Sequence, residues 1–320
     1  MTSRQTHLTV LVCTHNRAEL LGRLLMSLNA ARQPPDWNVD VLVAANACTD
    51  GTHALLEKYQ RSESADRRLP LVWLGVPTPG KSHALNAAVT GLTADWVAFV
   101  DDDHRIDPDW LVALTRAIGL NPQADMFCGR VLQDWDGREP AWVHDTGPYR
   151  IYPLPIPKQD FGDQPRELTL DGPFPGGGNL VVRRDWIERI GPFRPELGPT
   201  GHDLGGAEDM EWLRRGLASG ARLYYVPETL QYHYVDLERL RLGYLMRKAF
   251  QRSASVVAIE SGDTRVPLYL YRKAATYGLK SLLALRADRR RFYLVRTAAA
   301  LGEIAGHRSR RRTLGVAPVA

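Results

Sequence analysis

Short apolar runs alternate with helix-type patterns along the first hundred residues. The run at 8–13, LTVLVC, is rich in β-branched residues, and the leucines of ELLGRLLMSLNAA, which follows a polar turn, recur at helical spacing. The same order of strand, turn and helix begins again with the strands 39–46, 69–75 and 96–103. Four strands that alternate with helices predict a parallel sheet that binds its ligands at the carboxyl ends of the strands.

The pattern changes after residue 103. A helix is predicted at 109–119, after Asp107-Pro108, and a strand at 126–133. Residues 134–175 are rich in Pro, Gly, Trp and Asp and have no steady period, so we expect a long irregular segment that faces an acceptor. Order resumes with GGGNLVVRRDWIERIG, a helix that starts near Glu208 and a strand that ends at Tyr234.

The charge is divided unevenly along the chain. Residues 236–320 contain 18 Lys or Arg and 6 Asp or Glu, a net charge of +12, whereas residues 1–235 contain 23 and 30, a net charge of −7. We therefore expect an acidic α/β domain at 1–235 and a basic, mainly helical extension at 236–320.

An amphipathic helix is predicted between residues 264 and 286. Its apolar positions are Leu268, Tyr271, Ala275, Gly278, Leu279 and Leu282. One interpretation is a helix that packs on the first domain. The other combines it with a set of arginines into a patch that binds an anionic membrane surface. These arginines are Arg289, Arg290, Arg291, Arg308, Arg310, Arg311 and Arg312. Nucleic acid is not an expected partner, because the sequence has no recognisable binding motif or aromatic stacking platform.

Cysteine usage and hydropathy indicate the compartment. Cys13, Cys48 and Cys128 are widely spaced and form no C-x-x-C pair, which argues against a disulfide framework and a zinc site. No apolar stretch approaches the ~20 residues that span a bilayer, and the first apolar run is too short for a signal peptide. We expect a cytoplasmic protein that can lie on the inner face of the plasma membrane.

Three consecutive carboxylates, Asp101, Asp102 and Asp103, follow the predicted strand WVAFV. Their mutual repulsion at the end of a buried strand calls for a ligand or cation. Hard oxygen ligands suit Mg²⁺ or Mn²⁺, which commonly bind carboxylates together with phosphate oxygens. The alternative is a solvated acidic turn that caps the next helix, a role that Asp107 already fits.

Seven segments, in their order and spacing, resemble family 2 glycosyltransferases, which share the GT-A fold. They are VLVCTHNRAELLGRLLMSL, VLVAANACTDGT, GKSHALNAAV, VAFVDDDHRIDPDWL, GGGNLVVRRDWIERIGPFRPELG, GAEDMEWLRRGLASG and YYVPETLQYHY. The resemblance covers residues 8–235. It implies transfer of a hexosyl group from a nucleoside diphosphate sugar to an acceptor hydroxyl, with inversion and a divalent metal ion. Cell-envelope polysaccharide or glycolipid synthesis is the implied setting.

The resemblance assigns the acidic cluster to a D-x-D motif. Asp101 or Asp102 would lie near the ribose, and Asp103, together with Asp101, would bind the metal that bridges the diphosphate. His233 would be a further ligand to the metal or the diphosphate, and an imidazole ligand would shift the preference from Mg²⁺ towards Mn²⁺. A lone histidine between two tyrosines can instead be a packed structural residue.

The pair Glu208-Asp209 opens a predicted helix. By resemblance to the family's E-D motif, Asp209 is the base that accepts the proton of the acceptor hydroxyl, and Glu208 shapes the acceptor side. Both carboxylates could instead complement the helix dipole. The family pattern also makes GGGN at 176–179 a close-packed turn that lines the sugar and acceptor site.

The loop after the first strand is predicted to contact the nucleotide base and ribose, through Thr14, Asn16 and Arg17. Arg17 could instead be a surface charge at the start of a helix. Lys81 would contact the base or the diphosphate, and its alternative is a solvated surface lysine.

The second strand ends Ala44-Ala45-Asn46, whereas many relatives have an aspartate before this asparagine that binds the base. Either Asn46 or Asp50 takes over that contact, or the base differs. The departure at Ala45 therefore leaves the identity of the nucleotide base open. The sugar, the acceptor and the stereochemistry of transfer, inversion or retention at the anomeric carbon, also stay open at this point.

Two other functions stay open. A sugar nucleotidyltransferase also combines a parallel sheet with carboxylate-bound Mg²⁺, but it normally has a Gly-rich basic loop after the first strand, which CTHNRAEL does not resemble. An inactive scaffold would bind a membrane or a partner protein through residues 236–320. The joint presence of Asp101, Asp103 and Asp209 argues against the scaffold.

Overall fold

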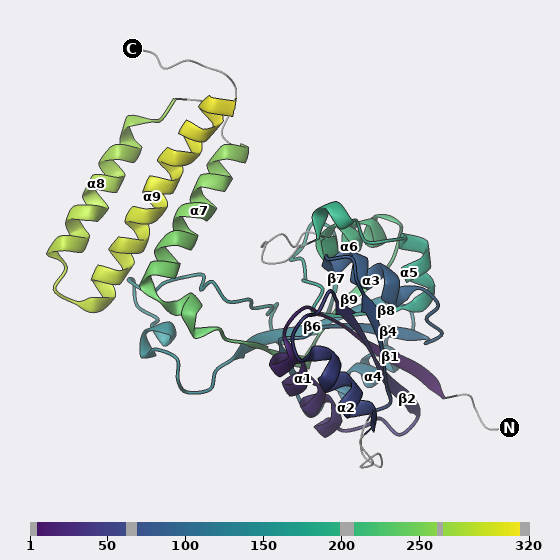
Figure 1. The fold of residues 1–320 in the computed structure, drawn as a ribbon. Helices are drawn as coiled ribbons and strands as arrows, with labels where there is room; N and C mark the ends of the chain where they lie inside the picture. The colour runs from purple at the N-terminus through teal and green to yellow at the C-terminus, as the bar shows by residue number, and fades with distance from the viewer. Residues whose placement is uncertain (1–4, 62–68, 199–207, 261–264, 314–320) are drawn as a thin grey trace. The chain divides into compact units, whose positions relative to one another are not determined.

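The computed structural model describes residues 5–61, 69–198, 208–260 and 265–313 (Figure 1). They form two compact units. Unit 1 comprises the residues up to 134 and 157–234, and unit 2 comprises residues 135–156 and those from 235 onward. Residues 135–156 therefore group with the C-terminal helices, although the sequence places them in the first domain. The division into a catalytic domain at 1–235 and an extension at 236–320 stays a prediction.

A mixed sheet of nine strands forms the centre of unit 1. The strands are β1 (Thr6–Thr14), β2 (Trp37–Asn46), β3 (Leu71–Val76), β4 (Trp96–Asp101), β5 (His104–Ile106), β6 (Met126–Asp134), β7 (Arg166–Leu168), β8 (Asn179–Arg183) and β9 (Leu223–Tyr234). Their order is β3-β2-β1-β4-β8-β6-β9-β5, and β7 also pairs with β9. As predicted, β1 to β4 are parallel. Antiparallel β8 then joins β4 to β6.

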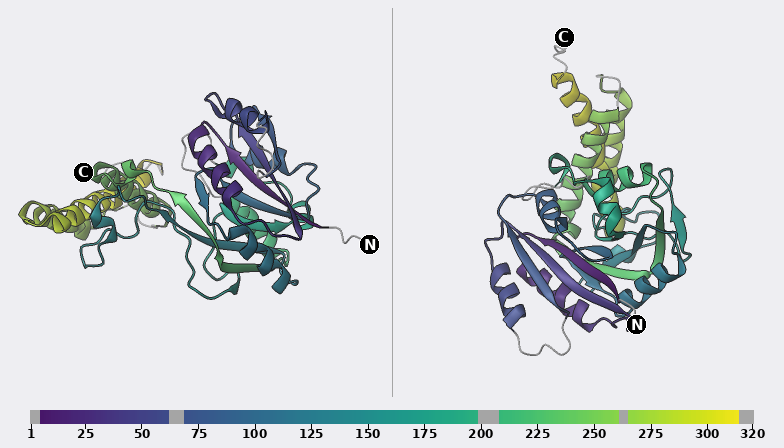
Figure 2. Two further views of the ribbon diagram at one scale, coloured as in Figure 1. Left: turned by 90° about the horizontal axis from the view of Figure 1, so that it is seen from below. Right: turned by 90° about the vertical axis from the view of Figure 1, so that its right-hand side faces the viewer.

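Helices cover both faces of this sheet (Figure 2). On one face lie α1 (Ala18–Ala30), α2 (Thr52–Arg61) and α4 (Trp110–Leu120), and on the other α3 (Lys81–Val89), α5 (Arg184–Ile190) and α6 (Glu208–Ala218). Each face of the sheet has its own hydrophobic core. Val10 and Val12 of β1 pack into the core with α1, α2 and α4, and Leu11 packs into the core with α3, α5 and α6, because side chains alternate along a strand. Burial on both faces explains why these strands read as continuous apolar runs.

Unit 2 is built on α7 (Leu242–Glu260), α8 (Leu268–Leu283) and α9 (Ala287–Thr313). The short 3₁₀ helices η2 (Ala141–His144) and η4 (Leu237–Leu240) also belong to it, whereas η3 (Pro195–Leu197) belongs to unit 1. Helix α9 packs against both α7 and α8. A Cβ at Gly302 of α9 would lie 2.2 Å from the Phe250 carbonyl oxygen of α7, so glycine permits the close approach of these two backbones.

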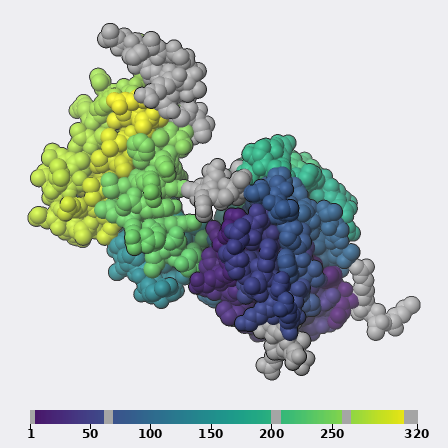
Figure 3. Space-filling view, viewed as in Figure 1, coloured from purple at the N-terminus to yellow at the C-terminus, as the bar shows by residue number. Residues whose placement is uncertain are grey.

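Several leucines of α8 are exposed. Leu268, Leu279 and Leu282 are 81%, 58% and 79% exposed, whereas Leu270 and Ser281 are buried. In Figure 3 the yellow-green atoms of α8 lie at the surface of unit 2. The predicted apolar face is therefore exposed at three of its leucines, whereas Tyr271 on the same face contacts Arg308 of α9. No described helix is long and apolar enough to cross a membrane.

Candidate active site

A cavity of about 340 Å³ lies at the carboxyl ends of β1, β2 and β4. Nine residues selected from the sequence line it: Thr14, Asn16, Arg17, Asn46, Lys81, Asp101, Asp102, Asp103 and His233. Cys13 also contributes to the lining, and it stays a neutral thiol because burial raises its pKa to about 12. The cavity thus lies where parallel strands end, the edge at which such sheets bind ligands.

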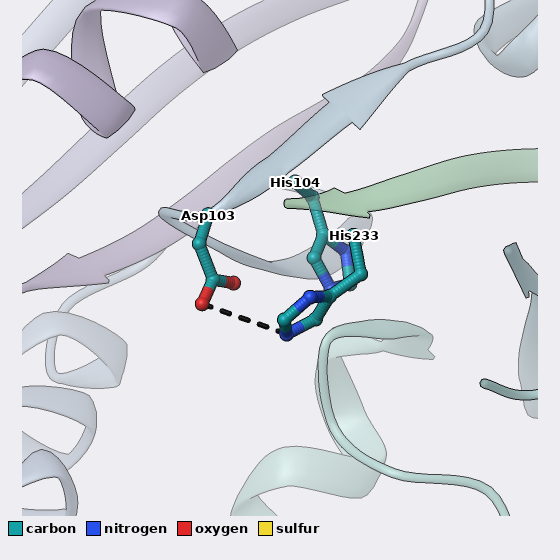
Figure 4. A group of neighbouring side chains, drawn as sticks. All are labelled: Asp103, His104 and His233. Atoms are coloured by element: carbon teal, nitrogen blue, oxygen red, sulfur yellow. Dashed lines mark ion pairs between the residues drawn. The ribbon is translucent and has the colours of Figure 1, made fainter. Parts of the chain in front are cut away.

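Asp103, His104 and His233 form a group that could hold a metal ion (Figure 4). Each offers one ligand atom, and these atoms lie within 4.8 Å of one another. His233 Nε2 is 3.5 Å from Asp103 Oδ2, and the two imidazole rings are 5.3 Å apart. One carboxylate and two imidazoles make a donor set that suits a first-row divalent cation such as Mn²⁺ better than Mg²⁺.

His104 is not among the residues predicted from the sequence. This residue opens β5, which pairs antiparallel with β9 so that His104 lies directly opposite His233. Its side chain and that of Ile106 are buried, while Arg105 between them is half-buried. A histidine directly after three aspartates was the available signal, but a strand of three residues is too short for its alternation, and so the burial of His104, to be recognised.

Asp101 contacts Lys81 and is not one of the three residues of that group. Lys81 Nζ lies 2.9 Å from Asp101 Oδ1 and 3.9 Å from Glu208 Oε1. Burial alone would lower the pKa of Lys81, but Asp101, Asp209 and Glu208 outweigh it and raise that pKa. Burial would likewise raise the pKa of Asp101, and Lys81 lowers it instead. Lys81 is therefore a permanent cation at the start of α3.

Arg17 pairs with the other two aspartates of the cluster. Its Nη1 is 3.0 Å from Asp102 Oδ1 and 3.1 Å from Asp103 Oδ2. Burial and the charge of Asp103 raise the pKa of Asp102 to about 6, against the effect of Arg17. The Arg17 side chain is 45% exposed, so the cavity presents a guanidinium that an incoming anion can reach.

The Asn46 side chain fixes the loop that leads to Lys81. Its Nδ2 donates to the Thr78 carbonyl at 2.7 Å, and its Oδ1 accepts from the Gly80 backbone N–H at 2.8 Å. Asn46 is buried, and these bonds occupy both ends of its amide. Its contact with a nucleotide base stays a prediction.

Asn16 and Asp50 join the loops after β1 and β2. Asn16 has a left-handed backbone, with φ of 53°, and its Oδ1 accepts from the Thr49 backbone N–H at 2.7 Å. Asp50 accepts from the backbone N–H groups of Ala18 and Thr52, at the starts of α1 and α2. Asp50 does not line the cavity, and this side chain is occupied as a helix cap.

A glycine turn separates Asp209 from Asp101. The Gly177 backbone N–H donates to Asp209 Oδ2 at 2.6 Å. A Cβ at Gly178 would lie 2.3 Å from Asp101 Oδ2 and 2.8 Å from His104 Cε1. The predicted close packing of the GGGN segment is therefore present at Gly177 and Gly178, where only glycine fits between these side chains, and its role in lining the sugar and acceptor site stays a prediction. A second cavity of about 20 Å³ is lined by Lys81, Asp101, Gly177 and Asp209 among others, which places Asp209 beside the same lysine.

Glu208 is buried at the start of α6, with 1% of its surface exposed. Its Oε2 accepts no hydrogen bond from a described residue, and burial raises the pKa of this carboxyl. Residues 199–207, which include Gly201, Gly205 and Gly206, lie outside the described residues.

The described side chains of the site carry more negative than positive charge. The site has two cations, Lys81 and Arg17, and five carboxylates: Asp101, Asp102, Asp103, Glu208 and Asp209. A diphosphate would add further negative charge, so its binding requires a compensating cation. The Asp103, His104 and His233 group fits that requirement, because a divalent ion held there would offset the carboxylates and the diphosphate together.

Comparison with known sequences agrees with this arrangement. Residues 9–191 match the model of "Glycosyl transferase family 2". The succinoglycan biosynthesis protein ExoM of Rhizobium meliloti is 25% identical over 252 residues, which cover 78% of this chain and 74% of that protein. The glucosyl-dolichyl phosphate glucuronosyltransferase of Haloferax volcanii is 26% identical over 165 residues, which cover 51% of this chain and 50% of that protein.

Solved structures share the fold at low sequence identity. S. aureus TarS 1–349 in complex with UDP has a TM-score of 0.56 at 17% identity, over 96% of this chain and 92% of that one. The mannosyltransferase PcManGT of Pyrobaculum calidifontis, in complex with GDP-Man and Mn²⁺, has a TM-score of 0.57 at 19% identity, over 96% and 88%. These likenesses confirm the GT-A fold with C-terminal helices. Since the family model matches more than half of its residues, the chain belongs to glycosyl transferase family 2 and is a glycosyltransferase.

Proposed function

We propose that this glycosyltransferase moves a hexosyl group from a nucleoside diphosphate sugar to an acceptor hydroxyl, with inversion and with a divalent metal ion. The observation that carries the proposal is the placement of two kinds of carboxylate in the site. Asp103 stands with two histidines in a metal-ligand group, and Asp209 stands apart from it across the Gly177-Gly178 turn.

The donor's diphosphate would bind in the cavity of unit 1, where Arg17 and Lys81 supply positive charge. Asp103, His104 and His233 would hold the metal, with Asp101 as the further ligand that the family motif predicts. When bound there, a divalent ion offsets the negative charge that develops on the leaving diphosphate. The related structures were solved with UDP, UDP-GlcNAc or GDP-Man, so uridine and guanosine diphosphate sugars are the first donors to test.

In the transfer step the acceptor oxygen attacks the anomeric carbon of the sugar. The new C–O bond forms as the bond from that carbon to the diphosphate oxygen breaks, and the bonding pair leaves with the diphosphate. Asp209 accepts the proton of the acceptor hydroxyl, and Lys81 stabilises the leaving group through its permanent charge. Glu208 shapes the acceptor side of the site.

The acceptor is proposed to be a glycan or a lipid-linked glycan of the cell envelope. One relative is named for succinoglycan biosynthesis and another for transfer to a glucosyl-dolichyl phosphate. We place the enzyme in the cytoplasm, on the inner face of the plasma membrane. The exposed leucines of α8 and the basic residues of 236–320 would contact an anionic membrane surface there. The side chains of Arg310, Arg311 and Arg312 lie outside the described part of the chain.

Asp209→Asn tests the proposed chemistry. The amide oxygen can still accept from the Gly177 N–H, so the turn should persist and the donor should bind as it does to the wild type. Transfer should fall by at least about 100-fold, because the general base contributes roughly that much. Donor binding by calorimetry and sugar transfer by product analysis separate the two effects, and near-normal turnover would remove Asp209 from the mechanism. Pyrophosphate release from a nucleoside triphosphate would favour the sugar nucleotidyltransferase instead.

A further inference from the structure

Unit 2 has a large cavity of its own, separate from the two cavities of unit 1 that Lys81 lines. Its volume is about 410 Å³, and it is formed by residues 150–155, α7 and α9. Much of its wall is apolar, with Leu154, Leu245, Phe292 and Val295 among the lining residues. Tyr152, which also lines it, is 78% exposed. A ligand with a hydrocarbon part could therefore bury that part against the apolar wall of this cavity.

Among the described residues, four cations and no carboxylate line the same cavity. They are Arg150, Lys248, Arg252 and Arg296. Arg150 donates to the Thr146 carbonyl and lies over the Tyr152 ring, and Arg296 lies over the Phe292 ring. Neither interaction neutralises the guanidinium, since no acid is involved.

Four described acids of unit 2 pair with cations that do not line the cavity. The pairs are Asp236 with Arg239, Glu238 with Arg241, Asp288 with Arg286, and Glu303 with Lys273. Lys248 and Arg252 are four residues apart on α7, a spacing at which like charges destabilise a helix. A bound anion would offset this repulsion.

We propose that this cavity binds the phosphate group of an amphiphile, with its hydrocarbon chain along the apolar wall. The two halves of the lining are complementary to the two halves of such a ligand: cations for the phosphate and apolar side chains for the chain. A phosphate ester of this kind can be a membrane lipid headgroup or the lipid carrier of an acceptor glycan. Its role as an acceptor carrier rests on the proposed transferase function, whereas its binding does not.

Calorimetric titration of the full chain, without donor or metal, tests the site. The probes are inorganic phosphate, alkyl phosphates of increasing chain length below their micellar concentrations, and dihexanoyl phosphatidylglycerol. We expect affinity for alkyl phosphates to rise about fourfold for each CH₂ that enters the cavity. Tighter binding of the alkyl phosphate monoester identifies a lipid-carrier site, and tighter binding of phosphatidylglycerol identifies a headgroup site; both support the proposal.

Two variants and two controls assign the binding to this cavity. Arg252→Gln and Arg296→Gln should each weaken alkyl phosphate binding about tenfold, through loss of a charge-assisted hydrogen bond. Both side chains are exposed, so the fold should tolerate the change. Arg290→Gln, on α9 but outside the cavity, and the Leu279→Gln/Leu282→Gln variant of α8 should bind as the wild type does.

Unchanged binding in both Arg252→Gln and Arg296→Gln would overturn the proposal, as would equal affinity for inorganic phosphate and a long alkyl phosphate. Binding of alkyl phosphate through these arginines, together with no binding of a nucleoside diphosphate with Mn²⁺, would support this site and contradict the proposed metal-dependent use of a nucleoside diphosphate sugar.

Discussion

Three neighbouring aspartates have three different surroundings. Asp101 contacts Lys81, Asp102 contacts Arg17, and Asp103 lies between Arg17 and His233. The sequence was sufficient to predict that the cluster lies at the carboxyl end of a buried strand, where the structure has a cavity. The partners come from distant parts of the chain, so the division of roles depends on the tertiary fold and could not be read from the motif.

His104 tests the metal-ligand group at the residue scale. His104→Asn should weaken Mn²⁺ binding by about 10- to 100-fold, because loss of a ligand or its close support has an effect of that order. Titration followed by electron paramagnetic resonance measures the affinity. His144→Asn is the matched control, since that histidine is 55% exposed in unit 2 and lies outside the group. Mn²⁺ affinity in His104→Asn equal to that of the wild type would exclude His104 as a ligand.

Gly178 tests the packing of the turn between the carboxylates. Gly178→Ala should destabilise the protein by about 1–3 kcal/mol, because an added Cβ would overlap Asp101 and His104. In Gly176→Ala the nearest atom, Asp209 Oδ2, would be 3.9 Å away, an ordinary contact, so this variant is the matched control. Urea unfolding compares the two, and equal stability would show that the turn has room for a side chain.

At the scale of elements, apolar runs and long periodic helices were predictable and short elements were not. The four parallel strands and the helix at 110–120 agree with the predictions, because each strand is an apolar run bounded by turn residues and the helix is long enough to show its period. The irregular segment 134–175 was recognised, but its division between the two units was not. Residues 157–175 return to unit 1 through β7 and through the pairing of Gln159 with Val131, which are long-range contacts with no local signal.

The outward face of α8 predicts membrane contact. Leu279→Gln/Leu282→Gln should weaken sedimentation with anionic vesicles by about tenfold for each leucine that enters the interface. Wild-type binding should also fall as salt rises, because the basic residues of 236–320 contribute.

Leu120→Gln is the control for that surface, since Leu120 is 69% exposed on α4 of unit 1. Vesicle binding that is insensitive to salt, or equal in the α8 variant and the control, would contradict a role for this helix at a membrane.

At the scale of the whole molecule, the two units have different chemistry. Unit 1 holds the cavity with Lys81, Arg17 and the acidic cluster, and unit 2 holds the cationic, apolar cavity and the exposed face of α8. The charge division between 1–235 and 236–320 was visible in the sequence. The cavity of unit 2 was not, because residues 150–155 and the two helices that form it come together only in the folded chain.

The most direct test of metal-dependent donor binding is thermal stabilisation of the protein by a panel of nucleoside diphosphates and their sugars, with and without Mn²⁺. We predict stabilisation by one nucleotide only when Mn²⁺ is present, about 2.7 kcal/mol at a ligand concentration 100 times Kd, and its loss in Asp103→Ala. No stabilisation by any nucleotide, or equal stabilisation without Mn²⁺ and in Asp103→Ala, would contradict the proposed site.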